Sequence, residues 1–208
     1  MLPRYGTQKR TNRKARPMKD VSATPYAQRL LELHLPRYGE IPRIDLYMDQ
    51  LVGFLEETLA PLYQPDEKII TRSMVNNYVK QGVLAAATGK KYTRAHVAYL
   101  VVICTLKQTF SLSEIDLLIR RQIATFDTGV AYDYYCDAFE AAVRALFGAR
   151  PASPQGLASG DAPGDFERDL VLASTAAVAY TLHIKASVAL IQEESAAGIG
   201  SQGVAGPA

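Results

Sequence analysis

The chain has 208 residues, of which 48% are hydrophobic, and a formal net charge of +2. A chain of this length and composition can bury a core and form one helical domain with a smaller second part, which excludes an entirely disordered protein. The charge is unevenly distributed, because the first 20 residues contain seven basic side chains and one acidic one, whereas the remaining 188 contain 16 basic and 20 acidic ones.

The basic N-terminal stretch predicts a disordered arm over residues 1–26. Its low hydrophobicity leaves too little apolar surface to order it, and such arms are either solvated or bound along a polyanion. The two descriptions are compatible, because binding to phosphates is driven by counterion release and does not require the free arm to be ordered. No apolar run follows the basic residues, so we expect no signal peptide.

Two helices are expected next, over residues 27–35 and 45–59. Pro36 stops the first of them. In the second, apolar residues recur every three or four positions, and Asp45 and Asp49 lie near the positive end of the helix dipole. We interpret these two acids as solvated groups of a core helix, in preference to a catalytic carboxylate pair.

The helix expected over residues 71–81 has two distinct faces. Thr71 can cap its N-terminus, and Gly82 is placed to end it. Apolar residues occupy one side of this helix and polar residues the other. A compact turn segment at 85–92 follows and contains two adjacent lysines.

Several further segments complete the chain. Thr93 can cap an apolar central helix, and Ser111 with Glu114 forms a capping box that opens another helix. An accessory helix is expected within 122–148. A flexible linker rich in Pro, Gly, Ser and Ala, a last long helix and a disordered tail follow at 149–164, 165–197 and 198–208.

Cys104 and Cys136 each lie in an apolar helical pattern without a second cysteine nearby. They are expected to be buried thiols of a reducing compartment, which favours a cytoplasmic protein. The candidate for a membrane segment, 170–182, stays uncharged for 13 residues. That length is too short to span a bilayer, so no membrane partner is expected.

Signatures of catalysis are absent from the sequence. There is no Gly-x-Ser-x-Gly nucleophile motif, and the glycine spacing at 82–90 does not fit a phosphate-binding loop. His34, His96 and His183 are far apart, and none has a second ligand three or four residues away, so no metal site is expected. We therefore predict a protein that is not an enzyme and needs no cofactor.

The polar face of the 71–81 helix is the feature most typical of a function. An α-helix fits the major groove of duplex DNA, where Asn or Gln reads adenine and Arg reads guanine. Cations in the turn that follows would lie beside the same groove and hold phosphates. The alternative is an ordinary solvated helix face. The candidate DNA-binding residues are Arg72, Ser73, Asn76, Asn77, Lys80 and Gln81 on the helix, with Lys90, Lys91 and Arg94 after it.

Three motifs between residues 41 and 118 resemble the bacterial family known as domain of unknown function 1836. They are Ile-Asp-Leu-Tyr-Met-Asp-Gln at 44–50, Asn-Asn-Tyr-Val-Lys at 76–80 and Lys-Lys-Tyr-Thr-Arg-Ala-His at 90–96. The family has no established activity, so this resemblance implies a bacterial protein without implying what it does.

A more distant resemblance is to the superfamily of mercury-resistance regulators. Its module has a reading helix, a wing, a central helix and a Phe-Ser-Leu-x-Glu-Ile turn, and the segments 74–84, 91–93 and 110–115 follow that layout. The resemblance implies that the 71–81 helix enters the major groove while a wing at 85–92 contacts phosphate. Asn76, Asn77 and Lys80 would then lie at the DNA, with Lys90 and Lys91 in the wing.

This chain departs from that superfamily in three respects. Relatives usually have Arg where Asn76 stands and two prolines where Ala85 and Ala86 stand. Loss of the prolines makes the wing less rigid. This departure weakens the expectation that the wing contacts phosphate more than the expectation that the helix enters the major groove. The relatives dimerise through a long helix after the module, and no continuous coiled-coil pattern follows Ile119 here.

The predicted fold is mainly α, with a winged helix-turn-helix module at 27–121 followed by additional helices. The predicted function is that of a bacterial transcriptional regulator that binds double-stranded DNA, for which a homodimer on adjacent half-sites is the usual route to specificity. Such a dimer could pair through the 129–147 helix or the last helix. The alternative for both is packing in the core of the same chain, which we favour for the 129–147 helix. The competing hypothesis is a winged-helix protein-interaction module that binds no DNA. Aromatic residues that could line an effector pocket are interpreted as packing: Tyr132, Tyr134 and Tyr135.

Overall fold

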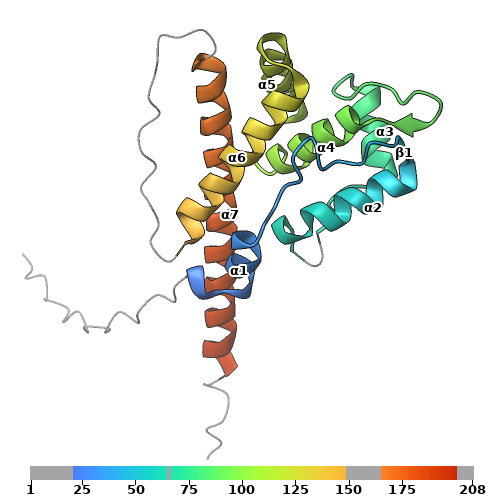
Figure 1. Ribbon diagram of the computed structural model, residues 1–208. Helices are drawn as coiled ribbons and strands as arrows, with labels where there is room; N and C mark the ends of the chain where they lie inside the picture. Colours follow the sequence, from blue (N-terminus) through green and yellow to red (C-terminus); the bar gives the residue numbers. More distant parts are fainter. Residues whose placement is uncertain (1–20, 65–66, 149–164, 201–208) are drawn as a thin grey trace, which may run out of the picture.

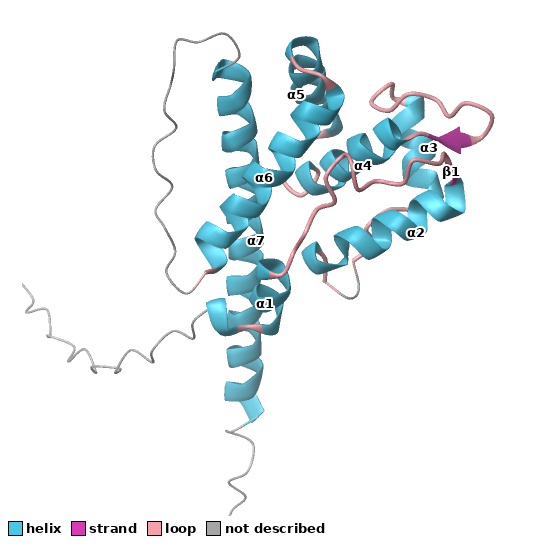
Figure 2. Cartoon of the chain, in the orientation of Figure 1, coloured by secondary structure: helices cyan, strands magenta, loops and turns pink. Residues whose placement is uncertain are grey.

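Helices pack around one apolar core, and a short two-stranded sheet lies at one end of the described residues (Figure 1). The computed structural model describes residues 21–64, 67–148 and 165–200. The prediction of a mainly α protein is confirmed, and Figure 2 shows how small the β part is. In chain order the elements are η1 (Val21–Ala23), α1 (Pro25–Leu31), β1 (Leu46–Tyr47), α2 (Met48–Leu59), η2 (Ala60–Leu62), α3 (Arg72–Lys80), β2 (Lys91–Tyr92), α4 (Arg94–Leu106), α5 (Leu112–Thr125), α6 (Thr128–Phe147) and α7 (Asp165–Gly200).

The folded part of the chain begins earlier than predicted. Thr24 caps α1, because its hydroxyl accepts a hydrogen bond from a backbone N–H of the first turn at 3.1 Å, and Pro25 fills the first helical position. The buried Tyr26 donates its hydroxyl to a carbonyl oxygen of η2 at 3.0 Å. Residues 21–26 of the predicted arm therefore belong to the fold, while residues 1–20 lie outside the described residues.

α1 also ends earlier than predicted, at Leu31 instead of residue 35. The segment after it is not helical, although Leu33 and Leu35 are buried. The Leu35 N–H donates to the carboxylate of Glu140 on α6 at 2.8 Å. The Leu35 N–H thus bonds to α6 and not to a carbonyl oxygen of α1. The helix therefore ends before Pro36, the residue predicted to stop it.

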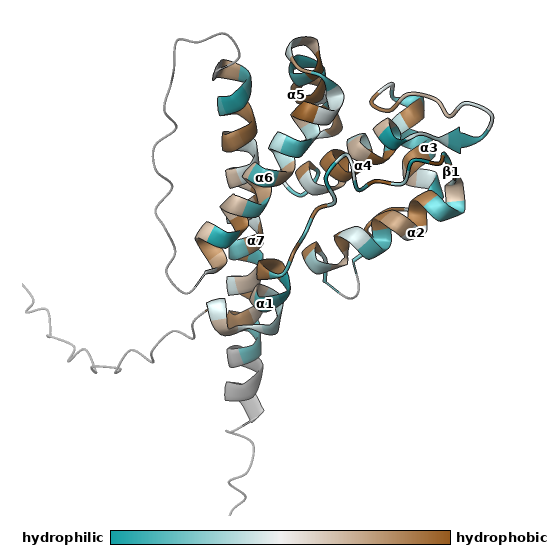
Figure 3. Ribbon diagram, in the orientation of Figure 1, coloured by the Kyte–Doolittle hydropathy of each residue, from teal (hydrophilic) through white to brown (hydrophobic). Residues whose placement is uncertain are grey.

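α4 is the centre of the core, as its apolar composition predicts. Leu100, Val101, Ile103 and Cys104 have 0% exposed surface, and α2, α5, α6 and α7 all contact this helix. Figure 3 shows hydrophobic residues along much of its length. Cys136 on α6 is buried as well, so the prediction of two buried free thiols is confirmed.

α5 opens with the predicted capping box. The Ser111 N–H donates to Glu114 Oε2 at 2.8 Å, and the Glu114 N–H donates to Ser111 Oγ at 3.4 Å. The helix continues to Thr125, so residues 122–125, which were assigned to the accessory helix, complete α5 instead. Asp127 then caps α6 by accepting a hydrogen bond from a backbone N–H at 2.8 Å.

α6 and α7 contact each other along much of their length (Figure 1). Both helices were predicted, and α7 continues to Gly200, which is three residues into the predicted tail. The apolar segment 170–182, predicted to be too short for a membrane span, lies in a longer apolar stretch of α7. Among the described residues, Phe166–Glu193 is long and apolar enough to cross a membrane by length and composition alone, and 33% of the 18-residue apolar window in it is buried in this fold. The predicted linker at 149–164 and the tail from residue 201 lie outside the described residues.

Candidate nucleic-acid interface

α3 has one buried face and one exposed face. Thr71 Oγ1 caps the helix by accepting the Met74 N–H at 3.2 Å, as predicted. Val75 and Tyr78 anchor the helix in the core, with 0% and 4% of their surface exposed. The opposite face contains the six predicted helix residues, all of them exposed: Arg72, Ser73, Asn76, Asn77, Lys80 and Gln81.

Asn76 and Asn77 present their amides to solvent. Within the described parts of the chain, neither side chain forms a hydrogen bond, so each amide keeps its donors and its acceptor free. Figure 1 places α3 and the sheet at the end of the molecule away from α7. No other described helix therefore covers this polar face.

The C-terminal end of α3 is held by backbone hydrogen bonds. Gly82 has a φ of +73°, and the N–H groups of Val83 and Leu84 both return to the Tyr78 carbonyl oxygen, at 3.0 and 3.2 Å. From α5, Arg120 Nη2 donates to the Gly82 carbonyl oxygen at 3.1 Å. Gly82 was predicted only to end the helix. In the structure its carbonyl oxygen also accepts a hydrogen bond from α5.

Arg72 is paired within the protein. One of its guanidinium nitrogens contacts a carboxylate oxygen of Asp49 on α2, and the two side chains remain 65% and 68% exposed. An ion pair this exposed contributes little to stability, because water screens it. Arg72 is therefore free to exchange Asp49 for another anion at small energetic cost.

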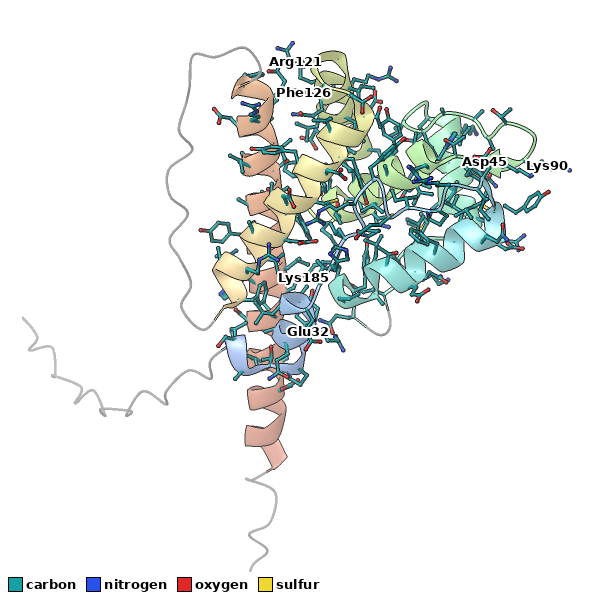
Figure 4. The ribbon with its side chains drawn as sticks, in the orientation of Figure 1. Glu32, Asp45, Lys90, Arg121, Phe126 and Lys185 are labelled. Carbon is teal, nitrogen blue, oxygen red and sulfur yellow. The ribbon has the colours of Figure 1, made fainter. Side chains whose placement is uncertain are left out.

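The turn segment after α3 forms a tight hairpin. The pairs Thr88 N–H to Lys91 oxygen, at 3.2 Å, and Lys91 N–H to Thr88 oxygen, at 3.0 Å, close a two-residue turn. Gly89 and Lys90 occupy the turn with φ values of +58° and +64°. Positive φ at both positions is the requirement of a type I′ hairpin turn. Lys90 projects from the tip, as Figure 4 shows.

The second lysine of the hairpin is engaged by a tyrosine. β2 pairs antiparallel with β1, which aligns Lys91 with Tyr47. The Lys91 ammonium lies 5.2 Å from the centre of the Tyr47 ring, and this ring is 54% exposed. Tyr47 therefore belongs to the same surface as the predicted lysines.

Arg94 has different surroundings from the other predicted residues. Its guanidinium lies 5.3 Å from the centre of the Tyr38 ring, and Nε and Nη2 are buried without a hydrogen-bond partner among the described residues. The side chain borders an open hollow that Arg43 and Asp45 also line. Arg94 is thus half-buried against the segment that precedes β1, and of the nine predicted residues it is the one whose charged group is turned inward.

Sequence reasoning missed Tyr47 and the pairing of Asp49. Both residues lie in the distinctive motif at 44–50, but a strand of two residues has no recognisable alternation. Asp49 also places negative charge next to Arg72, and Asp45 directly precedes β1. No group of three or more His, Cys, Asp or Glu side chains suited to a metal occurs in the searched, described part of the chain.

Comparison with known proteins finds a family without a known role. Residues 36–136 match the family described as Domain of unknown function (DUF1836). The match extends beyond the predicted span of 41–118 at both ends, and it confirms that resemblance. It covers β1, α2, α3, β2, α4, α5 and the first part of α6. No curated protein and no solved structure matches the chain, so the comparisons give no support to a similarity with mercury-resistance regulators.

Proposed function

We propose that this protein is a bacterial, cytoplasmic regulator of transcription that binds duplex DNA through α3. The observation that carries the proposal is the pair of exposed amides of Asn76 and Asn77, which have no hydrogen-bond partner among the described residues, on a helix whose other face is anchored in the core. An amide that keeps both a donor and an acceptor free can bind the N6 and N7 edge of adenine in the major groove.

The order of elements suits a winged helix-turn-helix. β1, α2, α3, the hairpin at β2 and α4 follow one another as strand, helix, helix, wing and helix. In this proposal α2 supports the reading helix α3, and the hairpin tip with Lys90 contacts the phosphate backbone beside the groove. Exposed Lys80 and Gln81 extend the contact along α3.

The basic side chains of this surface favour contact with the phosphates of DNA. Arg72 pairs with Asp49 in the free protein, and a phosphate could replace that carboxylate because both side chains are mostly exposed. Each lysine or arginine that neutralises a phosphate releases counterions, so affinity should fall steeply with salt concentration.

The test is selection of genomic DNA fragments by the purified full chain at two salt concentrations. We expect fragments to be retained at low salt and an enriched sequence to emerge. Asn77→Ala should weaken binding to that sequence by about 10-fold, corresponding to the ~1–3 kcal/mol of one base contact. Lys90→Ala should weaken binding to all sequences alike and reduce the salt slope by about one.

Gln28→Ala is the matched control, because Gln28 is exposed on α1 and far from α3 along the chain. This variant should bind like the wild type. Retention of no fragment at low salt by the wild type would contradict the proposal.

A second candidate function is a protein-interaction module. Ile44 is 72% exposed and lies three residues before the exposed Tyr47, which gives the same end of the molecule an apolar element. Such a surface would favour a protein partner, with binding that depends little on salt. Weak salt dependence with a retained protein partner would therefore favour this candidate.

A further inference from the structure

α7 has an inner side that packs on the rest of the chain and an outer face that stays in solvent. The helix lies at the opposite end of the molecule from α3 (Figure 1). Its buried residues recur every three or four positions and contact the other helices through one side: Val171, Thr175, Val178, Leu182 and Ala186. The opposite side, called the outer face here, follows an alternating spacing of four and three residues, and its members are exposed or half-buried: Phe166, Leu170, Ala173, Ala177, Tyr180, Ile184, Ser187 and Ile191.

The outer face exposes a large apolar area. Its four largest apolar side chains and the adjoining Val188 are between 43% and 62% exposed. A large side chain such as Phe or Tyr has roughly 150–250 Å² of surface, so these five expose about 500 Å² in each copy. A patch of this size is at the upper end of what monomers expose and is often functional. Covering it with a second copy would bury about 1,000 Å² in total, which is enough for a specific interface.

The charges of α7 favour a protein partner over a membrane. Lys185 is the only lysine or arginine between residues 169 and 193, and it points inward, where it donates to Gln108 Oε1 at 2.7 Å. Helices that lie on a membrane surface have Lys and Arg beside their apolar face, which α7 lacks. A spanning position would move inner polar groups into hydrocarbon, including Glu167, which pairs with Arg121 at 2.6 Å.

The side chains of the outer face are complementary in size to the same face run in the opposite direction. In an antiparallel pair centred between residues 178 and 179, Ala177 lies opposite Tyr180 of the second copy. Ala173 likewise lies opposite Ile184 of the second copy. Small residues opposite large ones fill successive layers without clashes or voids. The two-fold axis of such a pair repeats every contact, so one match in size is used twice.

A parallel pair would pack poorly. It would place Tyr180 against Tyr180 in one layer and Ala177 against Ala177 in the next, which crowds one layer and leaves a gap in its neighbour. The small residues also explain why the sequence shows no continuous coiled-coil pattern. Ala173, Ala177 and Ser187 interrupt the run of large apolar residues, although the spacing of four and three continues.

We propose that two copies of this protein pair through the outer faces of their α7 helices, in antiparallel orientation. The partner that covers this face is a second copy of the same chain. Pairing itself requires no DNA. Its consequence, that two α3 helices related by a two-fold axis bind inverted half-sites, rests on the proposed function.

Sedimentation equilibrium of the purified full chain tests the pairing. We expect twice the 22.8 kDa mass of one chain. Ile184→Glu places a carboxylate opposite Ala173 and should weaken pairing about 100-fold, because the charge would be buried without a partner. Leu117→Glu is the matched control, since Leu117 lies on α5 and is 68% exposed, and this variant should stay dimeric. Circular dichroism checks that both variants keep their helices.

Three results would overturn the pairing. They are a monomeric wild type, a dimeric Ile184→Glu protein, and a monomer whose α7 face instead binds vesicles of phosphatidylcholine and phosphatidylglycerol. These measurements contain no DNA, so a failure of DNA binding leaves their outcome independent.

Disulfide cross-linking tests the orientation. The native Cys104 and Cys136 are buried and do not interfere. In the antiparallel pair, positions 173 of the two copies are eleven residues apart along the helix axis, or roughly 16 Å. A disulfide joins Cα atoms only about 4–7 Å apart. Ala173→Cys protein should therefore not cross-link alone, whereas its mixture with Ile184→Cys protein should. Cross-linking of Ala173→Cys protein with itself would show a parallel pair and overturn the proposal.

Discussion

Arg37 and Glu140 form a two-point ion pair that joins the segment before β1 to the middle of α6. Arg37 Nη1 lies 2.8 Å from Glu140 Oε1, and Nη2 lies 3.0 Å from Oε2. The Glu140 side chain is only 6% exposed, and its Oε1 also accepts the Leu35 N–H at 2.8 Å. The pair therefore fixes residues that lie more than 100 positions apart in the chain, and through them the path that leads into the sheet.

Glu140→Ala should lower the free energy of unfolding by about 3 kcal/mol, because it removes the buried acceptor shared by the Arg37 guanidinium and the Leu35 N–H. Urea unfolding followed by circular dichroism measures this change. Asp137→Ala is the control, since Asp137 also contacts Arg37, at 2.7 Å, but is 69% exposed. Its loss should cost less than about 1 kcal/mol. An equal decrease in the free energy of unfolding in the two variants would contradict the argument that burial of Glu140 makes its ion pair the more important one.

The same carboxylate makes stability depend on pH. Burial acts to raise the pKa of Glu140, but hydrogen bonds from Arg37 and from the Leu35 N–H outweigh burial, so this pKa lies below its ordinary value of 4.5. A carboxyl whose pKa is lower in the folded state stabilises the fold above its unfolded pKa. That stabilisation is lost as pH falls through the folded pKa. Glu140→Gln should therefore be less stable than the wild type near neutral pH, and the difference should shrink in acid. A difference that stays constant from pH 7 to pH 3 would contradict this assignment.

Tyr135→Phe and Tyr132→Phe should affect stability in different ways, although both remove one buried hydroxyl from α6. Tyr135→Phe breaks the hydrogen bond to Thr105 and should cost about 1 kcal/mol, or roughly 2–4 °C in melting temperature. Tyr132→Phe removes a hydroxyl for which the geometry shows no hydrogen bond among the described residues, and it should leave the melting temperature unchanged or raise it. Differential scanning calorimetry compares the two variants. A destabilised Tyr132→Phe protein would show that its hydroxyl is satisfied in solution.

Gly82→Ala should destabilise the protein by about 1 kcal/mol through backbone strain alone. Its φ is +73°, and an added Cβ would meet nothing within 4 Å, so no clash contributes. Gly53 lies within α2, is exposed, and also has open space around a Cβ. Gly53→Ala should therefore stabilise the protein by up to about 1 kcal/mol, since alanine favours helix. Thermal unfolding of the two variants should show shifts of opposite sign, and shifts of the same sign would refute the argument.

The sequence by itself determined the helices whose ends are closed by local contacts. Thr71 and the Ser111 and Glu114 pair were recognisable because each cap joins residues three positions apart. The exposed face of α3 followed from helical periodicity in the same way, and so did the burial of Cys104 and Cys136. These features depend on hydrogen bonds and side-chain spacing within one or two turns, which a single sequence contains in full.

Only the tertiary structure decided the features that join distant residues. Tyr47 meets Lys91 because β1 pairs with β2 across more than 40 residues of chain, and two residues are too few to reveal a strand. Arg94 turns toward Tyr38, and Arg72 pairs with Asp49, because of where other segments pack against them. The small hollow lined by residues of α4, α5, α6 and α7 likewise exists only where these four helices meet and leave space between their side chains. Such contacts depend on which surfaces the core brings together, and neither spacing nor composition encodes that choice locally.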